Sequence, residues 1–331
     1  MVVNLLHKGE IGLAPMEGVI DAVTRELLTS TPGFDWTVTE FVRVVDARLP
    51  PRVFYKHCPE LAHANVATPS GTPVHLQLLG ADPKALAANA QQALSLGARS
   101  IDLNFGCPAK LVNRHDGGAS LLRQPERVYQ AVKAVADALD GEIPVTAKIR
   151  LGFSDRRLAI ACAQATESGG ASRLVVHGRT RDEGYRPPAH WEWIAKIRHR
   201  VALPVVANGD IWTLEDYWKA RTLSGCRDVM LGRSALADPW LAPRIRHWQR
   251  TGERLPDTTW PMRVSVLKQY AHRQRQQLPN RVVVSLVKQW LAQMRQGNAE
   301  ANLHFQRIKR ITDLDTLLDN LIVTTPVAEP A

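Results

Sequence analysis

Ser-Ile-Asp-Leu-Asn-Phe-Gly-Cys-Pro-Ala-Lys, residues 100–110, is the stretch that decides the fold. Its apolar start, 101–104, predicts a buried β-strand. That strand breaks off at Gly106-Cys107-Pro108, where glycine permits unusual backbone angles and proline fixes one. A cysteine on a sharp turn at the C-terminal end of a strand is held rigidly and points away from the core. This placement suits a reactive thiol, although many buried strand-end cysteines only pack against their neighbours.

Seven further runs resemble this strand. They are short and apolar, and they lack period-two alternation, which is typical of strands covered on both faces. The eight expected strands are residues 11–15, 36–41, 74–79, 101–104, 144–149, 174–177, 204–207 and 228–231. Helical patterns between them lie at 21–28, 82–96, 125–139, 157–168 and 214–223. Because no G-x-G-x-x-G or Walker loop follows any strand, we expect an α/β fold of the (β/α)8 TIM-barrel type rather than a doubly wound sheet.

The strand pattern stops after about residue 248. A polar linker at 249–260 precedes helical patterns at 262–276, 282–295, 299–310 and 313–322, which predict a small helical bundle. We therefore expect a catalytic barrel domain at 1–248, a helical domain at 249–322 and a disordered tail at 323–331.

The charge of the chain is concentrated in the helical segment. The net charge is +10, and residues 258–311 hold ten Lys or Arg against one acid, Glu300. A solvated basic face would explain this, but such segregation favours a polyanionic partner such as RNA, DNA or an anionic membrane.

The cysteine pattern and the apolar runs bear on the cellular setting. The four cysteines lack metal-ligand spacing, residues 1–8 are too short a run for a signal peptide, and no stretch approaches about 18 apolar residues. We expect a cytoplasmic monomer with no metal and no membrane association.

Polar or special residues stand at corresponding ends of the expected strands. All eight C-terminal strand ends of such a barrel converge on one face, which carries the active site. Singly, each residue has a structural explanation; His177, for example, is typical of a satisfied core histidine. The strand-end residues are Pro15, Met16, Glu40, Gln77, Asn104, Lys148, His177, Asn208, Gly209, Gly232 and Arg233.

Two of these ends predict a phosphate site. Asn208-Gly209 and Gly232-Arg233 follow the seventh and eighth strands, where barrels often bind phosphate. Glycine exposes backbone N–H groups there, and arginine supplies a bidentate cation. FMN would fit, with Lys148 near the N1–C2 edge of its ring and Cys107 across the substrate, ready to deliver a proton.

Several segments together resemble the tRNA-dihydrouridine synthases. The similarity spans nearly the whole chain, and the Asn-x-Gly-Cys-Pro turn with the later His-Gly-Arg-Thr is highly specific for that family. The matching segments are residues 14–18, 39–42, 77–80, 102–108, 117–122, 148–150, 176–180, 207–209 and 231–233.

This resemblance implies an FMN- and NADPH-dependent enzyme that reduces the C5–C6 double bond of a tRNA D-loop uridine. Flavin N5 would give a hydride to C6, and Cys107 a proton to C5. Asn104 and Arg150 would face the flipped uracil, a base that must leave its stack. The implied FMN contacts are Pro15, Met16, Glu17, Gln77, Lys148, His177, Asn208, Gly209, Asp210, Gly232 and Arg233.

The subgroup follows from two further segments, and the RNA contacts in the helical domain follow from its basic charge. Residues 40–46 and 287–290 resemble the bacterial enzymes that act on uridine 16. The partner would be tRNA, bound at its D-loop and acceptor or elbow region. The expected tRNA contacts beyond the uracil pocket are Arg43, Arg281, Lys288 and Arg295.

Two alternatives remain at this stage. A flavin barrel of the dihydroorotate dehydrogenase kind, acting on a free pyrimidine, shares the phosphate site but leaves the basic segment without a role. A catalytically inactive RNA-binding module explains the basic segment, but it leaves the flavin-site residues unexplained.

Overall fold

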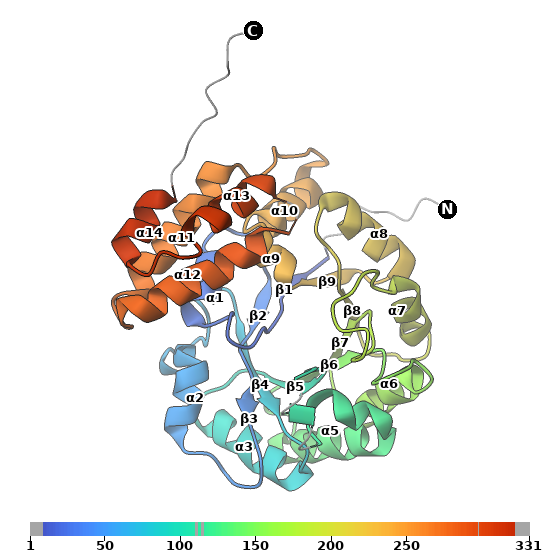
Figure 1. Ribbon diagram of the computed structural model, residues 1–331. Helices are drawn as coiled ribbons and strands as arrows, with labels where there is room; N and C mark the ends of the chain where they lie inside the picture. The colour runs from blue at the N-terminus through green and yellow to red at the C-terminus, as the bar shows by residue number, and fades with distance from the viewer. Residues whose placement is uncertain (1–8, 110–111, 114–115, 297, 322–331) are drawn as a thin grey trace.

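The computed structural model describes residues 9–109, 112–113, 116–296 and 298–321, so the expected tail at 323–331 lies outside it. Nine parallel strands form one sheet, which closes because β2 pairs with both β1 and β4 (Figure 1). The expected TIM barrel is confirmed. The strands are β1 (Ile11–Leu13), β2 (Trp36–Val38), β3 (Val42–Arg43), β4 (Val74–Leu79), β5 (Ile101–Phe105), β6 (Val145–Arg150), β7 (Arg173–His177), β8 (Val205–Asn208) and β9 (Asp228–Leu231).

Helices surround this barrel. Most of the expected ones carry local start signals: for example, the Asp82 side chain accepts from Ala85 N, and Thr213 and Asp216 form a capping box. Around the barrel lie α1 (Ala22–Thr29), α2 (Pro51–His57), α3 (Pro83–Ser95), α5 (Pro125–Leu139), α6 (Ala159–Ser168), α7 (Trp191–Arg198), α8 (Leu214–Ser224), α9 (Arg233–Ala237) and α10 (Leu241–Thr251), with 3₁₀ turns at Pro59–Ala62 and Gly118–Arg123. The sequence did not predict α2, α7, α9 and α10, none of which has a side-chain N-cap.

The second expected strand, 36–41, is broken in the structure. β2 pairs Val38 with His75, and β3 pairs Val42 with Leu78, so one extra residue is accommodated on the 36–43 side. The Thr39 hydroxyl accepts from Gln77 N at 3.0 Å and replaces a ladder bond at this β-bulge. The bulge directs Glu40 toward the β1–α1 loop, where its carboxylate accepts from the backbone N–H groups of Gly18 and Val19.

The lower part of the barrel interior is filled by side chains. Val175 and Val206 precede His177 and Asn208 by two residues, so they face the same side of the sheet. They pack with Trp36, Val38, Met230 and Ala14 in a cluster of their own. Open space inside the barrel is therefore confined to the C-terminal ends of the strands.

Four further helices pack at one side of the barrel, beside α1 and α9 (Figure 1). The indole N–H of Trp290 donates to Leu236 O at 3.0 Å and joins the bundle to α9. α10 runs past residue 248, and residues 252–259 connect it to the bundle. No helix within the described ranges is long and apolar enough to cross a bilayer. The four helices are α11 (Trp260–Gln274), α12 (Asn280–Met294), α13 (Ala299–Ile308) and α14 (Leu314–Asn320).

Candidate active site

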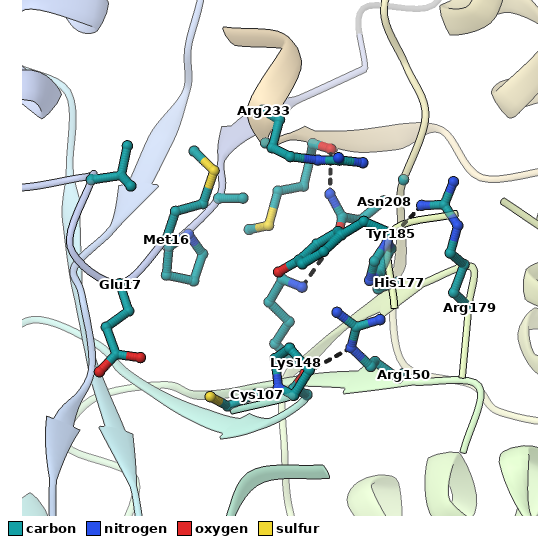
Figure 2. A pocket seen from close by; sticks show the side chains of 18 of the residues that line it. Met16, Glu17, Cys107, Lys148, Arg150, His177, Arg179, Tyr185, Asn208 and Arg233 are labelled. Atoms are coloured by element: carbon teal, nitrogen blue, oxygen red, sulfur yellow. Dashed lines mark hydrogen bonds between the residues drawn. The ribbon is translucent and has the colours of Figure 1, made fainter. Parts of the chain in front are cut away.

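A cavity of about 410 Å³ lies at the C-terminal ends of the strands. This volume falls within the usual range of small-molecule and cofactor sites. Figure 2 shows Cys107 and Arg233 on opposite sides of the cavity, with Lys148 between them. Predicted site residues that line it are Pro15, Met16, Glu17, Gln77, Asn104, Cys107, Lys148, Arg150, His177, Asn208, Gly209, Asp210, Gly232 and Arg233.

The Cys107 turn is held by the side chain of Asn104. Its Oδ1 accepts from the backbone N–H groups of Gly106 and Cys107, both at 2.9 Å. Gly106 does not adopt a positive φ, so the turn does not use the conformational freedom that glycine permits there. The carbonyl of Gly106 instead accepts from Arg150 Nε at 2.8 Å, and this bond ties the turn to β6.

The other side of the turn packs against Gly118. This residue has φ +60°, and a Cβ on it would lie 3.0 Å from the Cβ of Cys107, so only glycine fits without strain. Cys107 itself is 7 % exposed and clusters with Phe41 and Leu79. This burial raises the pKa of its thiol, and nearby Glu17 raises it further. The group is therefore a protonated thiol at neutral pH and can act as an acid.

Lys148 supplies a buried cation in the middle of the cavity. Its Nζ donates to Asn208 Oδ1 at 3.2 Å, and no carboxylate of the described chain forms an ion pair with it. Burial and the charge of Arg150 lower the pKa of this ammonium to about 8. Burial also lowers the pKa of Arg150 and of Arg233. Crowded cations of this kind favour an anionic ligand.

Arg150 itself is committed to the backbone. Besides Gly106, it donates to Thr180 O at 3.2 Å and to Gly184 O at 2.9 Å, and it is 2 % exposed. Its guanidinium carbon lies 5.2 Å from the centre of the Tyr185 ring. Arg150 therefore lines the cavity and also joins the Cys107 turn to the loop after β7.

His177 is neutral. Burial and the surrounding cations, Arg150 first among them, hold its pKa well below the usual value. Its Nε2 lies 3.3 Å from Nη1 of Arg179, the fully buried arginine of the same loop. Gly209, at φ +114°, lies so close that a Cβ would come within 2.9 Å of the His177 ring. His177 can therefore serve as a hydrogen-bonding group but not as a cation.

Asp210 organises the cationic side of the cavity. Burial acts to raise the pKa of its carboxyl, but the hydrogen bond and charge of Arg179 hold it below its usual range. The same carboxylate accepts from Ala189 N at 2.9 Å and lies 3.9 Å from Arg233. Asp210 therefore positions two arginines and also lines the cavity, so its direct contact with a cofactor stays a prediction.

Arg233 lies beside two aromatic rings. Its guanidinium carbon is 4.5 Å from the centre of the Tyr185 ring and 5.3 Å from that of Trp212. Gly232 next to it is half-buried and lines the cavity, and a Cβ on it would contact Ala14 and Met16 at 3.7 and 3.9 Å without a clash. An accessible backbone beside an arginine is suited to a phosphate group.

The expected RNA contacts lie outside the cavity. Arg43 is half-buried on β3, and Arg281 is exposed at the start of α12. Lys288 donates to the carbonyls of Lys309 and Ile311, at 3.0 and 2.5 Å. Arg295 donates to Asn302 Oδ1 at 3.0 Å. Lys288 and Arg295 therefore hold the bundle together.

Among the cavity-wall residues that sequence reasoning missed are Arg179, Tyr185, Trp212 and Gln293. Arg179 stands in the His-Gly-Arg-Thr segment, which was a signal for it. Gln293 comes from α12 of the helical bundle, and its Oε1 is buried without a hydrogen-bond partner. Among the described residues, no cluster of His, Cys, Asp or Glu could hold a metal ion.

Comparison with known proteins gives concordant matches. The family described as "Dihydrouridine synthase (Dus)" matches residues 12–327. The tRNA-dihydrouridine(16) synthase of Ralstonia nicotianae is 49% identical over 306 residues, 92% of this chain and 93% of that protein. That of Aquipseudomonas alcaligenes is 45% identical over 317 residues, 96% of this chain and 100% of that protein. A solved 2-naphthoyl-CoA reductase aligns with TM-score 0.56 and 10% identity over 73% of this chain and 50% of its own, which shows a shared fold.

Proposed function

The chain belongs to the dihydrouridine synthase family, and from that premise we propose that it reduces uridine 16 of the tRNA D-loop with Cys107 as the proton donor. The family reduces uridine to dihydrouridine in tRNA, so the protein is an oxidoreductase that acts on tRNA. Position 16 rests on the names of the similar proteins. The role of Cys107 rests on one observation: a buried, protonated thiol on a rigid turn at a cationic cavity.

FMN fits the residues of the cavity as a bound cofactor. Lys148, a buried cation that forms no ion pair with a described carboxylate, suits the anionic reduced ring, and Arg233 beside the half-buried Gly232 suits a phosphate. Gln77 and the neutral His177 provide hydrogen-bonding groups without adding charge. When bound, FMN supplies the hydride for C6 of the uracil.

The residues of this chain then perform the remaining chemistry. The Cys107 thiol transfers its proton to C5 as C6 is reduced, and the resulting thiolate regains a proton from solvent. Asn104 and Arg150 line the cavity on the same side as Cys107, so we assign the flipped uracil to that side. The ammonium group of Lys148 would stabilise the negative charge of the reduced flavin ring during these steps.

The helical bundle, proposed as the tRNA-binding domain at 249–322, acts together with this site. The bundle contributes Gln293 to the cavity wall. The domain proposed to bind the tRNA body therefore also borders the place where the uracil would react. The exposed cations of the bundle, Arg281 among them, and Arg43 on the barrel are proposed to contact tRNA phosphates. Lys288 and Arg295 are expected to contribute less, because their donors are already engaged. We propose NADPH as the reductant, a cytoplasmic location and action as a monomer.

The test is an assay on unmodified tRNA. The purified protein is expected to show a flavin spectrum and, with NADPH, to form dihydrouridine at position 16. Dihydrouridine at another position would overturn the site assignment. A flavoprotein that is inert on tRNA but reduces free uracil would support the dihydroorotate dehydrogenase-like alternative. A colourless protein that binds tRNA without reducing it would support the inactive module.

A further inference from the structure

Below the catalytic turn, three polar side chains form a buried row across three neighbouring strands. Gln77 on β4 is paired in register with Asp102 on β5, and Asp102 with Thr146 on β6. Asp102 Oδ2 accepts from Gln77 Nε2 at 2.7 Å, and Asp102 Oδ1 accepts from Thr146 Oγ1 at 2.6 Å. All three residues are at most 4 % exposed. Nothing in the proposed chemistry uses Asp102.

The row continues upward to the catalytic turn. Gln77 Oε1 accepts from Asn104 Nδ2 at 2.8 Å. Asn104 Oδ1 in turn accepts from the N–H groups of Gly106 and Cys107. An unbroken series of hydrogen bonds therefore runs from a buried carboxylate, through two amides, to the backbone of the proton donor.

The direction of every bond in this series is fixed from both ends. Backbone N–H groups only donate, so Asn104 must turn its oxygen to the Cys107 turn and its nitrogen to Gln77. Gln77 must then present its oxygen to Asn104 and its nitrogen to position 102. Only an acceptor satisfies a donor there, and the Asp102 oxygen Oδ2 is that acceptor. A buried donor left without an acceptor would cost the desolvation of that group.

We propose that Asp102 is a positioning residue, which fixes the orientation of the Gln77 and Asn104 amides and thereby holds the Cys107 turn in its reactive geometry. This inference rests on the proposed function of Cys107. It also has a consequence for substrate choice. With Oδ1 occupied by two backbone donors, Asn104 can offer a bound base only its spare N–H. It therefore suits a carbonyl oxygen of uracil and disfavours the amino group that cytosine carries at C4.

Two variants separate hydrogen-bond direction from charge. In Asp102→Asn, the amide oxygen can still accept from Gln77 while its NH₂ donates to Thr146, whose hydroxyl can rotate. In Asp102→Leu, a side chain of similar size accepts nothing, and the Gln77 amide is free to turn. Asp102→Val replaces the leucine variant if the latter lacks the wild-type circular dichroism spectrum.

The first readout is the reoxidation of dithionite-reduced holoenzyme. We expect Asp102→Asn to be reoxidised by tRNA within about threefold of wild type, and Asp102→Leu about 10²-fold more slowly, the usual effect of misplacing a reacting group by about 1 Å. Reoxidation by ferricyanide, which needs no positioned thiol, should be equal in all three proteins. If the rate of reoxidation by tRNA fell equally in both variants, the charge of Asp102 would matter rather than the direction of its hydrogen bonds, and the proposal would be wrong. Unchanged tRNA reoxidation in Asp102→Leu, or slower ferricyanide reoxidation, would also overturn the proposal.

The second readout needs neither flavin nor tRNA. Alkylation of Cys107 by iodoacetamide in the apoprotein, measured against a Cys107→Ser blank, is expected to be several-fold faster in Asp102→Leu and unchanged in Asp102→Asn. A released turn exposes the thiol and lowers its pKa toward normal. Equal rates in all three proteins would contradict the positioning role. If tRNA did not reoxidise the wild-type enzyme at all, the proposed function would fail. The alkylation rates would still show whether Asp102 holds the Cys107 turn in place.

Discussion

The barrel mouth and the helical bundle both carry residues that the sequence selected as functional, but the structure treats the two sets differently. At the barrel mouth, Cys107, Lys148 and Arg233 come from strands far apart in the chain and line one cavity. In the bundle, Lys288 and Arg295 point into contacts that hold the helices together. The exposed cations there that form no hydrogen bond or ion pair with described residues are Lys268, Arg281, Arg307 and Arg310.

This difference reflects the geometry of the two elements. Parallel barrel strands bring their C-terminal ends to one face, so a residue's place on its strand nearly decides its place in the molecule. A helix displays side chains in all directions, and a cation near a neighbouring helix end finds carbonyl groups to bind. Position in the sequence is therefore a good guide to the barrel site and a poor one to the RNA-binding surface.

Removing the thiol is the sharpest test of the barrel mouth. Cys107→Ala should lower the rate of dihydrouridine formation by about 10²–10⁴-fold, the usual contribution of a positioned general acid. FMN content, measured by absorbance, should be unchanged. Cys226→Ala is the matched control, because Cys226 is equally buried but lies outside the cavity wall. If the rate of dihydrouridine formation fell by a similar factor in both variants, Cys107 would not be the proton donor.

The next effect concerns Lys148. Lys148→Met should weaken FMN binding by about 10–100-fold, because a charged hydrogen-bond donor contributes about 1.5–3 kcal/mol. With a pKa of about 8, the ammonium is present below pH 8 and lost above it. FMN affinity, measured by fluorescence quenching, should therefore be constant up to about pH 8 and fall above it. Lys148→Arg stays charged, so its affinity should not follow this profile; the same fall in Lys148→Arg would assign it to another group.

The contact between the two regions should respond more weakly. Trp290→Phe removes the N–H that donates to Leu236 O and leaves that buried carbonyl unpaired. We expect a loss of about 1–2 kcal/mol in the free energy of unfolding, measured by urea denaturation. Because α12 carries Gln293 into the cavity wall, the KM for tRNA should also rise. A stability loss with an unchanged KM would show that the two regions act independently.

The smallest effect concerns the bundle surface. Lys268→Gln with Arg307→Gln should weaken tRNA binding and reduce the slope of log K against log salt concentration by about 1 for each phosphate that the protein no longer neutralises. Lys288→Gln with Arg295→Gln should instead lower the thermal stability, with less change in the salt slope. The reverse pattern would place the RNA surface at Lys288 and Arg295, as the charge distribution of the sequence predicted.

Much of the fold was predictable because barrel strands are short apolar runs with punctuated ends. Eight of the nine described strands overlap the expected ranges, β3 being the exception, and the helices that were found mostly carry caps or a proline at the first turn. The break at Thr39 was not visible, because a side-chain hydroxyl replaces a backbone partner there. α7 was missed because neither a cap nor a proline marks its start.

The candidate site was predictable where a residue's type and strand-end position coincide, as for Lys148 and His177. Asp102 shows the limit. It stands two residues before Asn104 on the same strand, and only the hydrogen bonds of Gln77 and Thr146 reveal its connection to Cys107. Gln293 could not be predicted either, because the sequence of an amphipathic helix does not show which cavity one of its glutamines borders.

The crowding of Lys148, Arg150, Arg179 and Arg233 has a consequence for the life of the protein in the cell. Among the described residues, the only carboxylate that forms an ion pair with any of these four cations is that of Asp210, so the barrel mouth keeps an excess of positive charge and is a weak point of the fold. A bound anionic cofactor relieves this repulsion and stabilises only the native state. With FMN as the proposed cofactor, cells short of riboflavin should therefore contain less of this protein, because the form without cofactor unfolds more often and is degraded by proteases.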